Sequence, residues 1–216
     1  MSAMLEHTLI GCISSRVCLY LSAASFESVA LPSPTRHELA GSLRRTLTPC
    51  TVACLRWVVR HADELLVDTS RIAGFGESAG AITSCGLAYV DSEGHSGNPG
   101  FASNVTCTIA LSGYLYTNTT GGLPAPRISS ASPPYMDIHG TADPWVPISM
   151  AEQTASVLST EGASNWLAKI PGGVHEPYQQ LWNESLGFGS AMYGFLVNSL
   201  RLDSSEFHNG AAAIHS

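Results

Sequence analysis

Residues 71–81 read RIAGFGESAGA and carry a Gly-x-Ser-x-Gly frame directly after a short apolar run. The frame consists of Gly76, Glu77, Ser78, Ala79 and Gly80. A serine in such a frame sits on a sharp turn from a strand into a helix, where a base can reach its hydroxyl. Glycines on either side permit the tight backbone of that turn. Ser78 is therefore a candidate nucleophile, and an ordinary glycine-rich turn is the alternative interpretation.

Strands and helices alternate along the chain around this turn. Apolar runs and helical spacings predict strands at 72–75, 105–111, 135–139 and 166–170, and helices at 79–89, 148–159 and 192–200. A helix beginning at Cys50 is expected from the apolar stripe Val52, Leu55, Val59, Ala62 and Leu66. Such alternation predicts an α/β fold: a mostly parallel sheet with helices on both faces.

The length of 216 residues favours one domain. Residues 50–203 carry the regular pattern and form the expected core. Residues 1–49 are atypical, with one strand-like run at 16–22, and residues 204–216 are read as a C-terminal tail.

The charge balance excludes some partners. Charged residues make up only 12% of the chain and hydrophobic residues 44%, so part of the surface is expected to be covered. The net charge of -7 and the lack of a basic, aromatic-rich run argue against nucleic acid as a partner. No apolar stretch is long enough for a transmembrane helix.

The localisation and the oligomeric state stay open. The N-terminus resembles a secretory signal only loosely, while Asn104, Asn118 and Asn183 lie in Asn-x-Ser/Thr triplets that would be glycosylation acceptors in an exported protein. A cytoplasmic and a secreted protein both remain compatible with these features.

The six cysteines form no Cys-x-x-Cys pair, so no metal site is indicated, and Cys85 and Cys107 are expected to be buried free thiols.

Two further polar residues lie in loops at the carboxyl ends of predicted strands, as Ser78 does. Asp143 comes after the strand at 135–139, and His175 comes after the strand at 166–170. Because the carboxyl ends of parallel strands share one edge of the sheet, we expect the serine, the acid and the base to meet there. Asp143 as a turn residue and His175 as a surface histidine are the alternatives.

Other residues near Asp143 and Ser78 offer similar chemistry. Asp137 is the rival acid, but it lies within its strand, and His139 is read as a structural residue of the acid loop. Trp57 is expected to pack in the core. For Trp145, pocket lining and core packing are both open.

The stretches GFGESAGA, DIHGTADPWVP and GGVH, with the segment at 68–71, resemble an α/β-hydrolase of the carboxylesterase and lipase kind over about residues 50–200. The resemblance implies a serine hydrolase that acts on small-molecule or lipid-like esters and needs no metal or organic cofactor. It makes Ser78 the nucleophile, Asp143 the acid, His175 the general base and the backbone N–H of Ala79 an oxyanion donor.

The chain departs from this family in two respects. The N-terminal strands of the family's sheet are expected to be missing or degenerate, with the run at 16–22 as the lone candidate for one of them. A loop that donates to the oxyanion is lacking as well. The family supplies a second oxyanion donor from a Gly-rich loop upstream of the nucleophile, whereas the only glycines before Gly74 are Gly11 and Gly41. Loss of one donor costs about 10² to 10³ in rate. Two hypotheses follow: an esterase with impaired activity that lacks part of the N-terminal fold, which is favoured, or an inactive hydrolase-fold protein with a binding role.

Overall fold

The computed structural model describes residues 8–13, 16–21, 51–90, 98–116 and 126–202, with β1 and β2 described by their backbone alone. Its centre is a six-stranded sheet whose strands lie side by side in chain order. The strands are β1 (Thr8–Ile13), β2 (Arg16–Leu21), β3 (Ala73–Glu77), β4 (Cys107–Leu111), β5 (Tyr135–Gly140) and β6 (Asn165–Ile170). β1 pairs antiparallel with β2, and every pairing from β2 to β6 is parallel.

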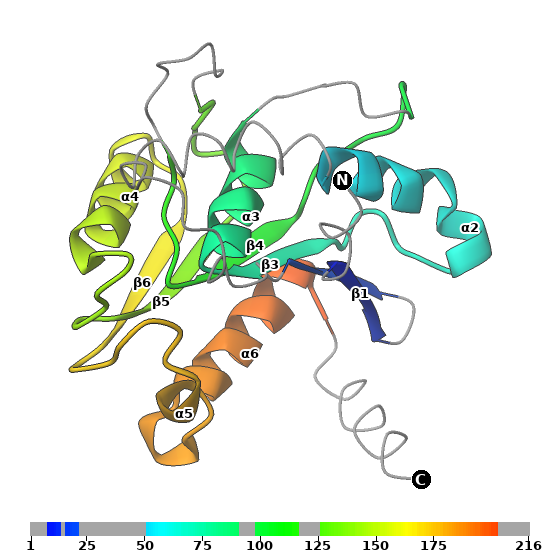
Figure 1. Ribbon diagram of the computed structural model, residues 1–216. Helices are drawn as coiled ribbons and strands as arrows, with labels where there is room; N and C mark the ends of the chain where they lie inside the picture. Colours follow the sequence, from blue (N-terminus) through cyan, green and yellow to red (C-terminus); the bar gives the residue numbers. More distant parts are fainter. Residues whose placement is uncertain (1–7, 14–15, 22–50, 91–97, 117–125, 203–216) are drawn as a thin grey trace, which may run out of the picture.

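Helices cover both faces of the sheet (Figure 1). Residues 51–60 are helical and precede α2 (Ala62–Leu65), α3 (Ala79–Tyr89), α4 (Ile148–Thr160), α5 (Tyr178–Leu181), the 3-10 helix η1 (Glu184–Leu186) and α6 (Phe188–Leu200). α3 and α4 lie on one face, and α6 lies on the other. The predicted α/β architecture is confirmed.

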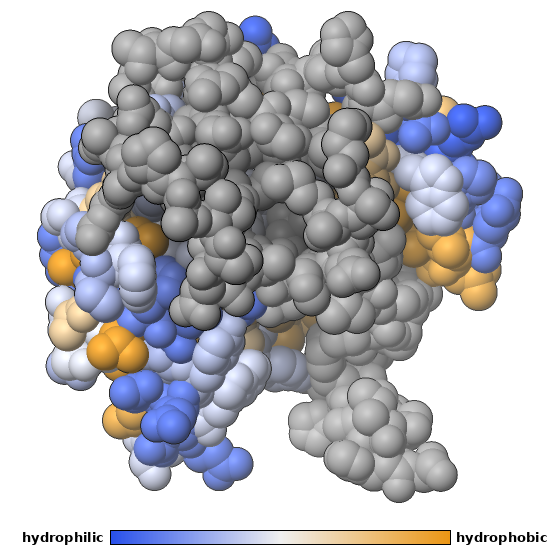
Figure 2. Space-filling model, in the orientation of Figure 1, coloured by the Kyte–Doolittle hydropathy of each residue, from blue (hydrophilic) through white to orange (hydrophobic). Residues whose placement is uncertain are grey.

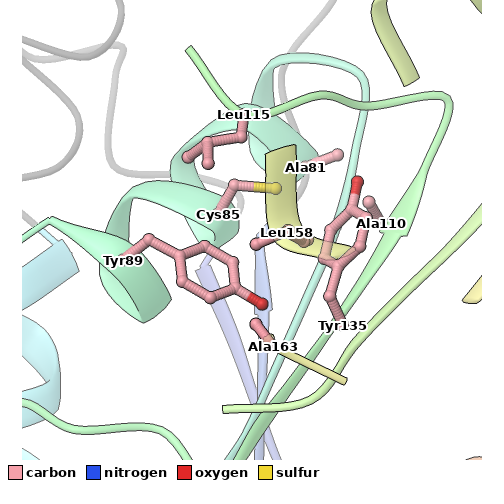
Figure 3. Packing of buried hydrophobic residues seen from close by; sticks show 8 residues of the cluster. All are labelled: Ala81, Cys85, Tyr89, Ala110, Leu115, Tyr135, Leu158 and Ala163. Carbon is pink, nitrogen blue, oxygen red and sulfur yellow. The ribbon is translucent and has the colours of Figure 1, made fainter. Parts of the chain in front are cut away.

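Alternate residues of the central strands form two cores. On the α3 and α4 face, the buried cluster of Figure 3 contains Ala81, Cys85, Tyr89, Ala110, Leu115, Tyr135, Leu158 and Ala163. On the α6 face, the buried cluster contains Ile109, Leu111, Met136, Ile138, Ala168, Ile170 and Leu181. Since β4 and β5 are covered on both sides, they are buried at every position, as is typical of parallel strands.

Most predicted elements are present within one or two residues of their expected bounds. The strand expected at 16–22 is β2. β1 was not predicted, because a single six-residue run without clear alternation carries no local signal for its pairing with β2. α5 and η1 were also missed, since one helical turn is too short for a periodic pattern.

The helix expected from Cys50 to Leu66 is only partly correct. It is interrupted at His61, and Leu66 ends α2 in a left-handed conformation with 73% of its surface exposed. The expectation that Trp57 packs in the core is wrong: its side chain is 45% exposed and lies against the His61 ring at a centroid distance of 4.6 Å. Figure 2 shows hydrophobic surface at this α2 end of the molecule, where Leu65 and Leu66 are exposed.

Further expectations concern the cysteines, the ends of the chain and membrane-spanning helices. Cys85 is a buried free thiol as expected, and Cys107 is buried as well. Most of the atypical segment 1–49, the tail 204–216 and the acceptor Asn118 lie outside the described residues. Among the described helices, none combines the length and the apolar character that crossing a bilayer would require.

Candidate active site

Ser78 occupies the turn between β3 and α3 in a strained backbone conformation. Its φ is 50° and its ψ is -118°, which costs a residue other than glycine about 1–3 kcal/mol. The Ser78 N–H donates to the carbonyl of Leu111 at 2.9 Å, which anchors the turn to β4. A Cβ on Gly76 would collide with the backbone of Gly80 and would lie 2.7 Å from the nitrogen of Ala81. The glycines of the frame therefore let the helix approach the strand that carries the serine.

The structure brings the three residues predicted from the sequence together at one edge of the sheet. His175 Nε2 lies 2.9 Å from Ser78 Oγ, and His175 Nδ1 lies 2.7 Å from Asp143 Oδ2. The Asp143 side chain is fully buried, whereas the His175 side chain is 18% exposed. The result is a continuous path of hydrogen bonds from a buried carboxylate to a hydroxyl.

The loops that carry the acid and the base are joined by backbone hydrogen bonds. The N–H of Thr141 donates to the carbonyl of Ile170 at 3.0 Å, and the N–H of Ala142 donates to the carbonyl of Gly173 at 2.9 Å. The N–H of Gly172 donates to Thr141 Oγ1 at 2.8 Å. These bonds hold the two loops in a common register, so the separation of Asp143 and His175 does not depend on their side chains alone.

Asp143 is fixed through both of its carboxylate oxygens. Oδ1 accepts hydrogen bonds from the N–H groups of Trp145 at 2.8 Å and Val146 at 2.9 Å, while Oδ2 accepts from His175. Burial opposes ionisation, but the hydrogen bonds from His139, His175 and the two backbone N–H groups hold the pKa of Asp143 well below its usual value. Asp143 is thus an ionised, oriented acceptor for His175.

The rival acid Asp137 faces a different set of partners. It is fully buried within β5, and its Oδ2 lies 3.1 Å from the Tyr135 hydroxyl and 3.4 Å from His139 Nδ1. Burial raises the pKa of Asp137, and the hydrogen bonds from His139 and Tyr135 oppose that rise. The carboxylate bonded to His175 is that of Asp143.

His139 is buried beside the acid, in line with its interpretation as a structural residue. Its Nε2 lies 2.9 Å from the carbonyl oxygen of Val146. Burial alone would lower the pKa of His139, but hydrogen bonds with Asp137 and Asp143 raise it to about 10.

The sequence did not point to Ser112 or Glu176, which support the histidine loop. The N–H of Glu176 donates to Ser112 Oγ at 3.0 Å, and the N–H of Ser112 donates to the carbonyl of Ile138 at 3.0 Å. Both residues have positive φ, 57° for Ser112 and 49° for Glu176. A glycine at either position would have signalled a turn, whereas a serine and a glutamate give no such signal.

A second carboxylate lies near His175. Glu176 Oε1 lies 3.7 Å from His175 Nε2, and burial together with the nearby charge of Glu77 raises the pKa of Glu176. Trp145, whose role the sequence left open, is 67% exposed and is not a core residue. In the described parts of the chain, no group of three or more His, Cys, Asp or Glu residues is arranged to hold a metal ion.

Comparison with solved structures identifies esterases of the same fold. The native esterase 2 of the planctomycete Thermogutta terrifontis is 22% identical, with a TM-score of 0.57 over 70% of this chain and 63% of that chain. Its propionate-bound form is 20% identical, with a TM-score of 0.60 over 73% of this chain and 66% of that chain. A truncated carbohydrate esterase from gut microbiota is 18% identical, with a TM-score of 0.58 over 71% of this chain and 68% of that chain. The chain thus spans less than two thirds of the length of esterase 2.

A family assignment comes from the sequence itself. No curated protein matches the chain. Residues 45–188, however, match the family described as phospholipase/carboxylesterase, and this match includes Ser78, Asp143 and His175. Since the match covers well over half of the chain and the sheet has the architecture of the esterases above, the protein belongs to the phospholipase/carboxylesterase family of α/β-hydrolases.

Proposed function

We propose that this protein is a serine hydrolase that cleaves carboxylic esters, with Ser78 as nucleophile, His175 as general base and Asp143 as the orienting acid. The observation that carries the proposal is the hydrogen-bonded path in which Asp143 Oδ2, the two ring nitrogens of His175 and Ser78 Oγ follow one another at 2.7 and 2.9 Å. Both distances fall within the range that nucleophilic catalysis requires.

The roles follow from what each group can accept or donate. His175 Nε2 takes the Ser78 proton as Ser78 Oγ attacks the ester carbonyl, and it then gives that proton to the departing alkoxide. The acyl group is left on Ser78. A water molecule, deprotonated by His175, attacks this acyl-enzyme and releases the carboxylic acid. Asp143 accepts the Nδ1 hydrogen throughout and stabilises the imidazolium.

The start of α3 supplies a donor for the developing oxyanion. Ala79 is the first residue of α3, and the first N–H groups of a helix have no acceptor within the helix. The N–H of Ala79 is therefore assigned as an oxyanion donor, supported by the positive end of the helix dipole. Acyl transfer by this route requires no metal or organic cofactor.

Small-molecule or lipid-like esters are the proposed substrates. The similar structures described above are those of esterases, and the esterase 2 of Thermogutta terrifontis has been captured phosphonylated by sarin. That enzyme thus reacts with an organophosphonate. A fluorophosphonate probe is accordingly a suitable reagent for the serine of the present chain.

The test is hydrolysis of p-nitrophenyl acetate and butyrate by the full chain and by two serine variants. Ser78→Ala is expected to lower the rate to that of buffer, because it removes the nucleophile. Ser84→Ala is the matched control, since it removes a buried α3 hydroxyl that bonds Thr108 rather than His175. The fluorophosphonate is expected to label the wild type and Ser84→Ala, but not Ser78→Ala. Equal hydrolysis by wild type and Ser78→Ala would contradict the proposal, and an unlabelled, inactive wild type would favour the binding role instead.

A further inference from the structure

The ring of His139 lies between two buried carboxylates. Nδ1 is 3.4 Å from Asp137 Oδ2, and Nε2 is 3.5 Å from Asp143 Oδ2. The side chains of all three residues are fully buried. Asp143 Oδ2 is the same oxygen that accepts the hydrogen bond from His175 at 2.7 Å. The series of polar contacts that links Ser78, His175 and Asp143 therefore continues through His139 to Asp137 in β5.

The geometry of His139 calls for a charged ring. Both ring nitrogens face acceptors: a carboxylate on the Nδ1 side, and on the Nε2 side a carboxylate together with the Val146 carbonyl at 2.9 Å. A neutral imidazole donates through one nitrogen only, whereas an imidazolium donates through both. Two buried carboxylates without a cation between them would also repel each other. A positive His139 satisfies both requirements.

Val146 connects His139 to Asp143 by a second route. Its carbonyl lies 2.9 Å from His139 Nε2, while its N–H donates to Asp143 Oδ1 at 2.9 Å. Val146 and Asp143, both in the loop after β5, are thus held to the His139 ring and to each other. Removal of the ring would release this loop as well as the carboxylate.

Asp137, at the inner end of this series of contacts, is surrounded by buried side chains. The Tyr135 hydroxyl lies 3.1 Å from Asp137 Oδ2, and Cys85 of α3 lies in the same cluster as Tyr135 (Figure 3). Burial raises the pKa of Tyr135 and of the Cys85 thiol, so both stay neutral near pH 7. Glu152 of α4 is exposed and pairs with Lys169 at 2.6 Å. Among the described residues, the carboxylates that face His139 are those of Asp137 and Asp143, and His175 lies on the other side of Asp143.

We propose that His139 is a positioning residue for the hydrolysis: held by Asp137, it keeps Asp143 aimed at His175 and offsets part of the Asp143 charge. This role rests on the proposed serine esterase function, because it acts through the Asp143–His175 bond. His139 touches no reacting atom. Its effect is expected in the orientation and in the proton affinity of the base.

The experiment compares His139→Gln with Ile138→Val in the full chain. Ile138 is the preceding residue of β5, and its side chain packs on the opposite, α6 face, so Ile138→Val perturbs packing and leaves the network intact. Rates are expressed per serine labelled by the fluorophosphonate, and the kcat/KM of an ester is followed against pH.

For His139→Gln we expect kcat to fall by about 10- to 100-fold with KM unchanged, because a small displacement of a catalytic group costs this much. Loss of the positive charge also favours the protonated, inactive form of His175. The acid limb of the profile is therefore expected to move to higher pH, by roughly half a pH unit or more. Asp137→Asn should move it in the same direction, since His139 then loses the carboxylate that stabilises its charge. Ile138→Val should leave the acid limb in place.

A spectroscopic measurement makes the test independent of turnover. The Nδ1 proton shared by His175 and Asp143 is followed by NMR in the full chain carrying Ser78→Ala, with and without His139→Gln. We expect its far-downfield resonance to shift or broaden when His139 is replaced. An unchanged resonance and an unmoved acid limb would overturn the positioning role, even if stability fell. If the wild type shows no hydrolysis that depends on Ser78, the proposed function fails, and the resonance still decides whether His139 holds Asp143.

Discussion

Gly140, the last residue of β5, packs directly against Gly173 in the loop that follows β6. A Cβ on Gly140 would overlap the carbonyl groups of Gly173 and Val174. The contact lies at the base of the two loops that carry Asp143 and His175. The separation of the proposed acid and base therefore depends on two residues that have no side chain.

Gly140→Ala is expected to lower both stability and activity. The added methyl group has no space and must push the histidine loop away, an overpacking cost of about 1–3 kcal/mol in the free energy of unfolding. The midpoint of thermal unfolding should fall by several degrees, and kcat should fall more than the loss of folded protein explains. Circular dichroism melts and ester hydrolysis at a temperature where both proteins are folded check this.

Gly194→Ala is the matched glycine control. Gly194 lies inside α6, and within the described part of the chain no atom outside the backbone of α6 itself would lie within 4 Å of a Cβ at that position. Alanine is the better helix former, so the free energy of unfolding should rise by up to about 1 kcal/mol while activity stays unchanged. Equal loss of activity in both glycine variants would show that the Gly140 contact has no special role in holding the loops.

Asp143→Asn is expected to reduce kcat by about 10⁴-fold while KM changes little. The amide can turn an N–H toward His175 Nδ1, which stabilises the wrong tautomer of the base. The measurement is steady-state hydrolysis of p-nitrophenyl butyrate, with folding checked by circular dichroism. Glu152→Gln, which changes an exposed carboxylate paired with Lys169, should retain full activity. A loss of less than tenfold for Asp143→Asn would remove Asp143 from the proposed acid role.

Ser112→Ala tests the support of the histidine loop. Ser112 Oγ accepts the hydrogen bond of the Glu176 N–H at 3.0 Å, and loss of such an acceptor costs about 1–3 kcal/mol when the donor is left unsatisfied. Hydrogen exchange of the Glu176 amide should accelerate, and kcat should fall because His175 is the preceding residue. Unchanged exchange at Glu176 would mean that Ser112 does not restrain this loop.

The stability of the fold should decrease as the pH rises through the alkaline range. The pKa of His139 is raised from 6.5 to about 10 by its hydrogen bonds with Asp137 and Asp143, which outweigh the effect of burial. Its contribution is therefore fully present below pH 6.5 and is lost progressively toward pH 10. Urea unfolding between pH 6.5 and 9 should show this fall in the wild type and a much flatter profile in His139→Gln. Below about pH 8 the fall is due to His139, because the ordinary pKa values of 9.0 for Cys85 and 10.0 for Tyr135 lie above that pH.

Asp143 contributes at the other end of the pH scale. Its pKa is held below the ordinary value of 3.8, so its stabilising contribution is present above that pH and is lost as the pH falls further. Acid unfolding of Asp143→Asn should lack this component. The two titrations have opposite signs because one group is stabilised as a cation and the other as an anion.

Local sequence rules were sufficient where the chemistry of a few adjacent residues decides the structure. The frame around Ser78 predicted a strand, a turn and a helix, and a Cβ at position 76 would indeed collide with the backbone of Gly80. The same reasoning located Asp143 and His175 after their strands, and the parallel arrangement implied one common edge. These elements depend on periodicity and turn chemistry, which any short window of the sequence contains.

Other features depend on contacts between distant segments. The exposure of Trp57, the pairing of β1 with β2, the support of Glu176 by Ser112 and the placement of His139 between two carboxylates could not be predicted, because a residue's type does not say which distant residue it will meet. The sequence alone determined the order of the strands from β3 to β6 with the helices α3, α4 and α6, and the residue types at the carboxyl edge of the sheet. Only the tertiary structure decided the hydrogen-bond distances within that edge and the buried charges behind it, since both arise from packing segments up to 97 residues apart.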